Sequence, residues 1–285
     1  MTERSAHLRG VAERVAERLP GHVTDVVLTG STSRGVADSE SDVEVLVIAE
    51  RLPDPEELPL AELQSWAPGL SGADWFGGWF EEEWIELVWW TADHAEERVR
   101  GIAAGEFVDH ARLRTAEALV NGITLRGDRH AGWVEQLSRY PAGLAARIID
   151  DVCADWTEPI RAQRSVLREG DALLLAQRLV QDAEGILRVV FALNEAWEPG
   201  WKRLARRVEP LAVKPDRLAE RIDAAIRALD LQAMRSLAAE ALALAPETPK
   251  LREARRLLLE PVSVGSTELT RERRRRLRRR RERGM

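Results

Sequence analysis

The chain has 285 residues, 45% hydrophobic and 32% charged, which is enough for two globular domains with apolar cores. Its one cysteine, Cys153, excludes an intramolecular disulfide and a cysteine-rich zinc site. Glu3, Arg4 and Arg9 interrupt the first residues, and no apolar run approaches the roughly 20 residues of a membrane helix. We therefore expect no signal peptide and no membrane partner, and we predict a cytoplasmic protein.

The net charge of −6 is unevenly distributed along the chain. Residues 271–285 hold ten Arg and two Glu, hence +8, which leaves −14 for the other 270 residues. We predict that residues 263–285 form a basic, disordered tail, because they have too few apolar residues to bury a core. The tail is a possible contact for RNA, but the acidic body disfavours a long nucleic-acid footprint.

The first predicted elements are a helix and a strand–turn–strand unit. Leu8, Val11, Val15 and Leu19 recur at helical spacing, and a Pro-Gly pair then ends the helix. Residues 26–35, Val-Val-Leu-Thr-Gly-Ser-Thr-Ser-Arg-Gly, read as a buried strand and a tight turn that opens a short helix. A second strand follows over residues 41–48.

Two acids, Asp42 and Glu44, lie at the start of the second strand, two residues apart. Strand side chains alternate, so both carboxylates point to the same face and repel each other. A divalent cation removes this repulsion, and Mg²⁺ prefers one or two carboxylates together with substrate phosphates. Backbone N–H groups of the turn at Gly30 and Ser31 suit a phosphate. The alternative is a hairpin-like loop with a surface acid pair.

The Gly-Ser turn, followed about ten residues later by Asp-x-Glu in an apolar strand, resembles the signature of the nucleotidyltransferase superfamily. Its members include polymerase-β-like enzymes and the aminoglycoside and lincosamide adenylyltransferases. The resemblance implies that Gly30 and Ser31 contact a nucleoside triphosphate and that Asp42 and Glu44 hold two Mg²⁺ ions. It also implies a triphosphate contact for Arg34.

Farther along, Pro59 to Leu63 is predicted to begin a helix, with Pro at its first position. Residues 83–90 read as a strand by β-propensity, and Glu86 is an acid among apolar neighbours in it. In the superfamily a later strand supplies a third metal-binding carboxylate, a role that the resemblance implies for Glu86. Three other acids compete for this role, Glu81, Glu82 and Glu83, but they lie in the polar segment before the apolar part of the strand. The alternative for Glu86 is a solvent-facing acid on an edge strand.

Five of the ten Trp residues lie between positions 75 and 90. The indole ring of Trp stacks on a nucleic-acid base or on one face of a sugar. Packing is the commoner role of such residues, and we expect it for at least three of the five.

The rest of the chain reads as mostly helical, with short breaks at Pro or Gly. We predict helices over residues 92–103, 108–119, 144–167, 173–196, 215–229 and 231–244, and an edge strand over residues 123–125. No internal repeat is present.

Residues 194–202, Asn-Glu-Ala-Trp-Glu-Pro-Gly-Trp-Lys, resemble a stretch in the helical domain of antibiotic-type nucleotidyltransferases. The resemblance implies that Lys202 faces the triphosphate; the alternative is a helix–helix turn with a solvated lysine. On the preceding helix Arg178 and Asp182 are spaced for an ion pair, which we expect at the surface. Asp182 or Glu184 is a base for the acceptor only if that face meets the site.

We predict an α/β fold in which a small mixed sheet with flanking helices precedes an α-helical bundle. The domains are residues 1–128, 129–262 and the tail at 263–285. The expected activity is Mg²⁺-dependent transfer of a nucleoside monophosphate from an NTP, with ATP as the expected donor, to a hydroxyl of a small molecule. Aminoglycoside-, lincosamide- or nucleoside-like acceptors fit the acidic body. The alternatives are transfer to tRNA or protein, and a non-catalytic nucleotide-binding protein.

Overall fold

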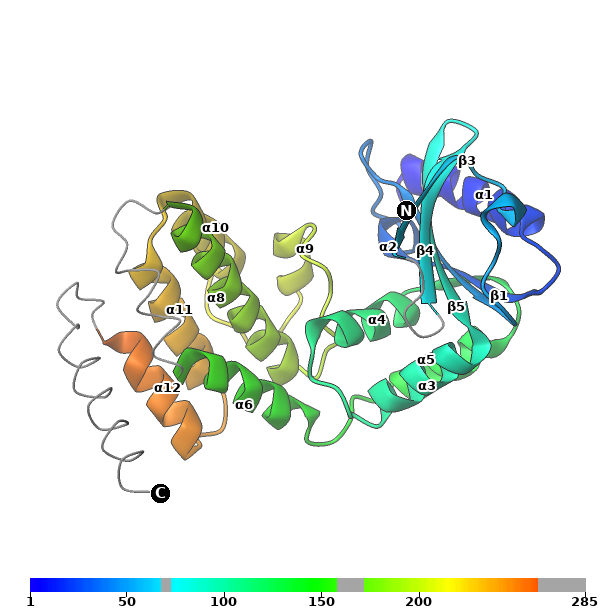
Figure 1. Cartoon of the computed structure of the whole chain (residues 1–285). Helices are drawn as coiled ribbons and strands as arrows, with labels where there is room; N and C mark the ends of the chain where they lie inside the picture. The colour runs from blue at the N-terminus through cyan, green and yellow to red at the C-terminus, as the bar shows by residue number, and fades with distance from the viewer. Residues whose placement is uncertain (68–72, 158–171, 261–285) are drawn as a thin grey trace, which may run out of the picture. The chain divides into compact units, whose positions relative to one another are not determined.

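The computed structural model describes residues 1–67, 73–157 and 172–260, and it divides the chain into two compact units (Figure 1). The first unit comprises Met1–Leu144 and Ala196–Gly200, and the second comprises Ala145–Glu195 and the chain from Trp201. The predicted basic tail lies outside the described residues. Within the described residues, no helix is long and apolar enough to cross a bilayer.

The first unit is built on a six-stranded mixed sheet in the order β3-β4-β5-β2-β1-β6. All neighbouring strands are antiparallel except β2 and β5, which are parallel. Its elements are α1 (Glu3–Arg18), β1 (Val23–Leu28), α2 (Gly30–Ser33), β2 (Val43–Ala49), the 3₁₀ turn η1 (Pro55–Glu57), β3 (Ala61–Ala67), β4 (Ala73–Phe80), β5 (Glu83–Thr91), α3 (Ala92–Ala103), α4 (His110–Val120), β6 (Ile123–Arg126) and α5 (Arg129–Leu137).

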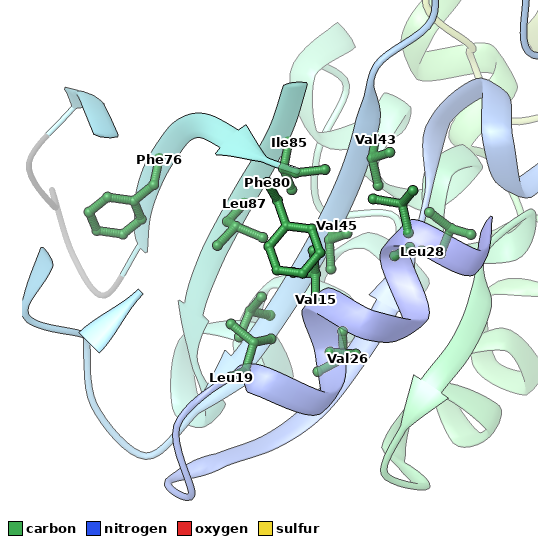
Figure 2. Packing of buried hydrophobic residues seen from close by; sticks show 14 of the residues in the cluster. Val15, Leu19, Val26, Leu28, Val43, Val45, Phe76, Phe80, Ile85 and Leu87 are labelled. Atoms are coloured by element: carbon green, nitrogen blue, oxygen red, sulfur yellow. The ribbon is translucent and has the colours of Figure 1, made fainter. Parts of the chain in front are cut away.

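Helix α1 covers one face of this sheet (Figure 2). Its apolar stripe, which includes Val15, packs on alternate residues of β1, β2, β4 and β5. On β5 these are Ile85, Leu87 and Trp89, all fully buried. Alternation therefore sends the residues between them, including Glu86, to the opposite face.

The opposite face is only partly covered by helices. Val27, Leu46, Ile48 and Trp90 form a second core cluster with side chains of α3, α4 and α5. This cluster occupies the part of the face where Ile48 pairs with Trp90. The beginnings of β2 and β5, where the acids lie, fall outside this cluster.

Residues 196–200 belong to the first unit although they follow helices of the second in the sequence. Trp197 donates its indole N–H to the carbonyl of Leu137 at 2.8 Å and packs against Tyr140. The buried carboxylate of Glu198 pairs with His110 Nδ1 at 2.8 Å. This segment is thus held on the first unit by both apolar and polar contacts.

The second unit is helical. Helix α11 packs against α8 and α12, and α10 packs against α8 and α11. The described helices are α6 (Leu144–Thr157), α8 (Ala172–Leu193), α9 (Leu204–Val208), α10 (Leu218–Ala228), α11 (Leu231–Ala243) and α12 (Pro249–Leu259).

The α/β architecture with a following helical region is as predicted, with local differences. The helix expected from Pro59 is wrong, because residues 61–67 form strand β3, which pairs with β4. Helix α5 follows the predicted boundary at residue 128 yet lies in the first unit with residues 196–200. These units are defined by contacts, so the limits 1–128, 129–262 and 263–285 stay predictions. The second half of the helix predicted over 144–167 lies outside the described residues.

The pair of Arg178 and Asp182 forms as the spacing predicts, but it is buried rather than at the surface. Arg178 Nη2 lies 2.6 Å from Asp182 Oδ1, and Asp182 is 1% exposed. The same oxygen accepts the indole N–H of Trp156 at 2.9 Å. Burial raises the pKa of Asp182, and the neighbouring Arg178 opposes that shift. The pair therefore belongs to the interior of the helical unit.

We predict that Asp182→Ala lowers the free energy of unfolding by about 3–5 kcal/mol, because it leaves a buried guanidinium without its partner. The double variant Arg178→Met/Asp182→Leu should recover most of that loss, since apolar groups of similar size replace a buried pair at little cost. Urea unfolding followed by circular dichroism measures both.

The matched control is Asp223→Ala, which removes an i,i+4 partner of Arg227 from an exposed pair. Solvent screens that pair, so unfolding should hardly change. An equal loss in the two single variants would contradict the role assigned to burial.

Candidate active site

The three acids singled out in the sequence come together on one sheet face. Parallel pairing of β2 with β5 sets Glu44 directly opposite Glu86. Asp42 immediately precedes β2 and lies two residues from Glu44, so it points the same way. One carboxylate oxygen from each residue lies within 4.8 Å of the others. The strand register alone therefore produces the cluster.

This donor set fits a hard divalent cation. The three side chains are half-buried, so water screens their mutual repulsion only in part. Mg²⁺ takes oxygen ligands, typically one or two carboxylates with water and substrate phosphates. Three carboxylates that leave room for such ligands match this requirement.

Gly30 lies directly against the cluster. Its φ is +70°, and a Cβ there would lie 2.6 Å from Glu44 Oε2. Only glycine meets both conditions without strain, because other residues disfavour this φ and their side chains would displace the carboxylate. The Gly-Ser turn and the acid pair are thus neighbours in space.

Two threonines of the same turn hold the backbone of the acids. The N–H and the hydroxyl of Thr29 both donate to the carbonyl of Glu44, at 2.8 and 3.2 Å. The hydroxyl of Thr32 donates to the carbonyl of Asp42 at 3.4 Å. Ser31, which the resemblance assigns to the triphosphate, is buried in the one-turn helix α2. Neither threonine was singled out in the sequence, although both flank the Gly-Ser pair.

Arg34 ends the turn and pairs with an acid that the sequence did not single out. Arg34 Nη1 lies 3.5 Å from Glu117 Oε2 on helix α4. Glu117 is buried and also accepts the side-chain N–H of Asn121 at 3.2 Å. This carboxylate fixes the direction of the guanidinium beside the Gly-Ser turn. Helical periodicity gives no sign of it, because Glu117 reads as one polar residue among many.

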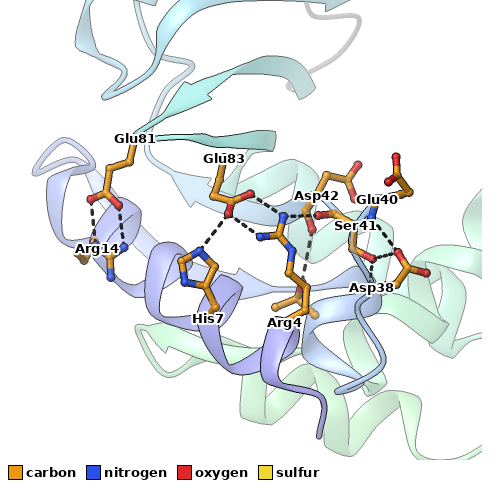
Figure 3. A network of polar contacts seen from close by, with 10 residues as sticks. Arg4, His7, Arg14, Asp38, Glu40, Ser41, Asp42, Glu81 and Glu83 are labelled. Atoms are coloured by element: carbon orange, nitrogen blue, oxygen red, sulfur yellow. Dashed lines mark hydrogen bonds and ion pairs between the residues drawn. The ribbon is translucent and has the colours of Figure 1, made fainter.

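Two of the competitors of Glu86 are engaged elsewhere (Figure 3), and the third, Glu82, is exposed. Glu83 makes a bidentate pair with Arg4 at 2.6 Å and also contacts His7. The hydrogen bonds with Arg4 lower the pKa of Glu83. Glu81 pairs with Arg14 at 2.8 Å, and the bond with that guanidinium lowers its pKa.

Arg4 also steadies the segment before Asp42. Its Nη2 donates to the carbonyl of Ser41 at 3.2 Å. Ser41 closes a turn with Asp38, to which its hydroxyl donates at 2.9 Å (Figure 3). The carboxylate of Asp42 therefore projects from a backbone fixed by α1 on one side and by Thr32 on the other.

The remaining predicted residues are not part of this cluster. Lys202 is an exposed residue of the second unit, and its role toward a triphosphate stays a prediction. Asp182 is sequestered in the buried pair with Arg178, which argues against its service as a base. Glu184 is half-buried on the same helix.

Comparison with known proteins agrees with this geometry. Residues 8–72 match the family described as the nucleotidyltransferase domain. The match spans the Gly-Ser turn and the Asp42–Glu44 pair. This match supports the resemblance to the nucleotidyltransferase superfamily that the motifs predict.

Among solved structures the chain is similar to a nucleotidyltransferase-like protein from Exiguobacterium sibiricum 255-15. The two share 15% sequence identity, with 94% of this chain and 80% of the other covered and a TM-score of 0.37. No curated protein matches the sequence.

We predict that Gly30→Ala lowers the free energy of unfolding by about 1–2 kcal/mol, from the positive φ alone. The added Cβ also displaces the Glu44 carboxylate, so Mn²⁺ affinity should fall. Urea unfolding and Mn²⁺ titration measure the two effects.

Gly132→Ala is the control, because a Cβ at this position of α5 meets nothing within 4 Å. It should leave the protein as stable as before or slightly more so. Wild-type stability and Mn²⁺ affinity in Gly30→Ala would contradict the contact with Glu44.

Proposed function

We propose that the protein is an Mg²⁺-dependent nucleotidyltransferase that moves a nucleoside monophosphate from an NTP to a hydroxyl of a small molecule. The observation that carries this proposal is the cluster of Asp42, Glu44 and Glu86 beside the Gly30-Ser31 turn. Residues 8–72, which include all of these except Glu86, match the nucleotidyltransferase domain. We expect the enzyme to be cytoplasmic and its donor to be ATP. The one cysteine of the chain, a buried free thiol, is compatible with that location.

In this proposal the acceptor oxygen forms a bond to the α-phosphorus of the NTP while the bond to pyrophosphate breaks. Pyrophosphate leaves and the hydroxyl proton passes to water. Asp42 and Glu44 would hold two Mg²⁺ ions, and Glu86 would hold one of them. When bound, Mg²⁺ supplies Lewis-acid stabilisation of charge on the phosphoryl oxygens.

The other residues bind and orient the nucleotide. Backbone N–H groups at Gly30 and Ser31 donate to phosphate oxygens. Arg34, held by Glu117, adds a fixed positive charge at the end of the turn. We expect Lys202 to contact the triphosphate as a compact point charge.

A second candidate is nucleotidyl transfer to RNA, and it depends on the ten arginines among residues 271–285. They supply the positive charge that the acidic body lacks. A non-catalytic nucleotide-binding protein is the third reading, and pyrophosphate release separates it from both enzymes. The deciding experiment is incubation with each labelled NTP, Mg²⁺ and a panel of aminoglycosides, lincosamides, nucleosides and tRNA, read as a mass shift of the acceptor.

Asp42→Asn should lower turnover by about a hundred-fold or more, because a metal site supplies several kcal/mol of transition-state stabilisation. Stability without metal should stay equal or rise slightly, since one of three repelling charges is removed. Pyrophosphate release and thermal unfolding measure these effects.

Glu82→Gln is the charge-matched control, an exposed acid close to β5 but outside the cluster. It should keep wild-type turnover. If Asp42→Asn keeps it as well, the metal assignment is wrong.

Truncation after Glu268 separates the two acceptor classes. It removes the net +8 of the tail, and we expect the melting temperature to stay within about 1 °C. With a small-molecule acceptor, turnover and its salt dependence should hardly change. With RNA, affinity should fall sharply, and the slope of log affinity against log salt should flatten by roughly 0.7–0.9 for each lost phosphate contact. A truncated protein that has lost activity on RNA alone would contradict the small-molecule proposal.

A further inference from the structure

Three tryptophans lie on the same sheet face as the acid cluster. In the antiparallel pairing of β4 with β5, Gly77 is opposite Glu86 and Trp79 is opposite Trp84. Residues two apart in a strand share a face, so Trp75 and Trp79 flank Gly77 there. Trp84 stands two residues before Glu86 on its own strand. The indole rings are therefore the neighbours of the third carboxylate on the side of β4.

Gly77 lets these rings lie against the sheet. Where its Cβ would stand, Trp84 Cζ2 is 2.6 Å away and Trp75 Cη2 is 3.1 Å away. Trp79 meets Trp84 edge to face, with ring centroids 5.5 Å apart. The three indoles thus form one aromatic surface, which we call the Trp platform, directly beside Glu86.

Core packing does not account for the Trp platform. The other two tryptophans of this stretch, Trp89 and Trp90, are buried, which is fewer than the three expected from the sequence. Trp79 is 41% exposed, and Trp75 and Trp84 are half-buried. Large apolar side chains gathered at the surface beside a polar site are typical of ligand recognition.

The Trp platform and the Gly-Ser turn lie on opposite sides of the acids. Gly30 contacts Glu44 from the side of β1, whereas Gly77 adjoins Glu86 from the side of β4. Across this face, in the order of the strands, the Gly-Ser turn comes first, then Glu44, then Glu86, and the Trp platform last. In-line phosphoryl transfer requires the attacking oxygen and the leaving pyrophosphate to be on opposite sides of the phosphorus. If the triphosphate binds at the turn, the acceptor approaches from the platform.

We propose that the Trp platform binds the acceptor, and that the acceptor is a small hydroxylated molecule with a sugar ring or a flat heterocyclic ring. The ring stacks on the indoles and its hydroxyl points toward Glu86. A cationic group on the ring system adds attraction to the carboxylates. This inference depends on the proposed function and narrows its substrate class.

The kinetic test uses the panel member that the enzyme modifies. Trp79→Ala should raise the acceptor KM by roughly ten- to a hundred-fold, the effect of losing one stacked ring, while the KM for NTP stays unchanged. Trp79→Phe should recover most of the affinity. Leu244→Ala, at a side chain of similar exposure in the helical unit, should change neither constant. Equal losses for NTP and acceptor, or no loss, would overturn the proposal.

A binding test needs no turnover. The full chain is labelled with 5-fluorotryptophan, and ¹⁹F resonances are assigned from Trp79→Phe and Trp84→Phe. Kanamycin A, adenosine, ATP and bulk tRNA are then titrated separately without Mg²⁺. Shifts at positions 79 and 84 with kanamycin A or adenosine but not with ATP, and none at buried Trp133, support the proposal. Shifts there with ATP, shifts with tRNA alone, or no shift with any of the four probes would overturn it.

The proposed function and the acceptor role of the Trp platform can be disproved separately. If no NTP releases pyrophosphate with any acceptor, the proposed function fails whatever the tryptophans do. If transfer occurs and the resonances at positions 79 and 84 stay fixed, only the Trp platform fails.

Discussion

The arrangement depends on the parallel pairing of β2 with β5, which sets Glu44 opposite Glu86 on one sheet face. Like charges at opposed strand positions are unfavourable, and Asp42 adds a third carboxylate within 4.8 Å. The buried side chains of the alternate residues fix the register, because a shift by one residue would turn the acids into the core under α1. The apolar face thus stabilises the sheet against the repulsion on the other face. A cation would remove what repulsion remains.

Two glycines adapt the backbone on either side of this row of acids. Gly30 approaches Glu44 at a φ that disfavours other residues, and Gly77 leaves room for two indole rings beside Glu86. A side chain at the first position would displace a carboxylate, and one at the second would displace the aromatic rings. The absence of a side chain thus leaves space for a carboxylate at one place and for indole rings at the other.

The α/β fold class and the shared face of the acids could be predicted from sequence, whereas strand β3 and several buried partners could not. Period-2 alternation sufficed to put Asp42 and Glu44 on one face, and Glu86 stood out as an acid among apolar neighbours. Strand β3 was missed because a proline followed by Leu and Ala favours a helix start locally, whereas pairing with β4 decides the structure. Glu117 and the burial of Asp182 were missed for a related reason. Glu117 meets Arg34, and Asp182 meets Trp156, through tertiary contacts that periodicity does not reveal.

Metal binding at the acid cluster is the central claim, and electron paramagnetic resonance of Mn²⁺ tests it most directly. The full chain is titrated with Mn²⁺, alone and with Mg²⁺ as a competitor, beside the double variant Glu44→Gln/Glu86→Gln. The account predicts that the wild-type protein binds Mn²⁺, that Mg²⁺ displaces it, and that the variant binds far less. Equal Mn²⁺ binding by the two proteins, or none by the wild type, would contradict it.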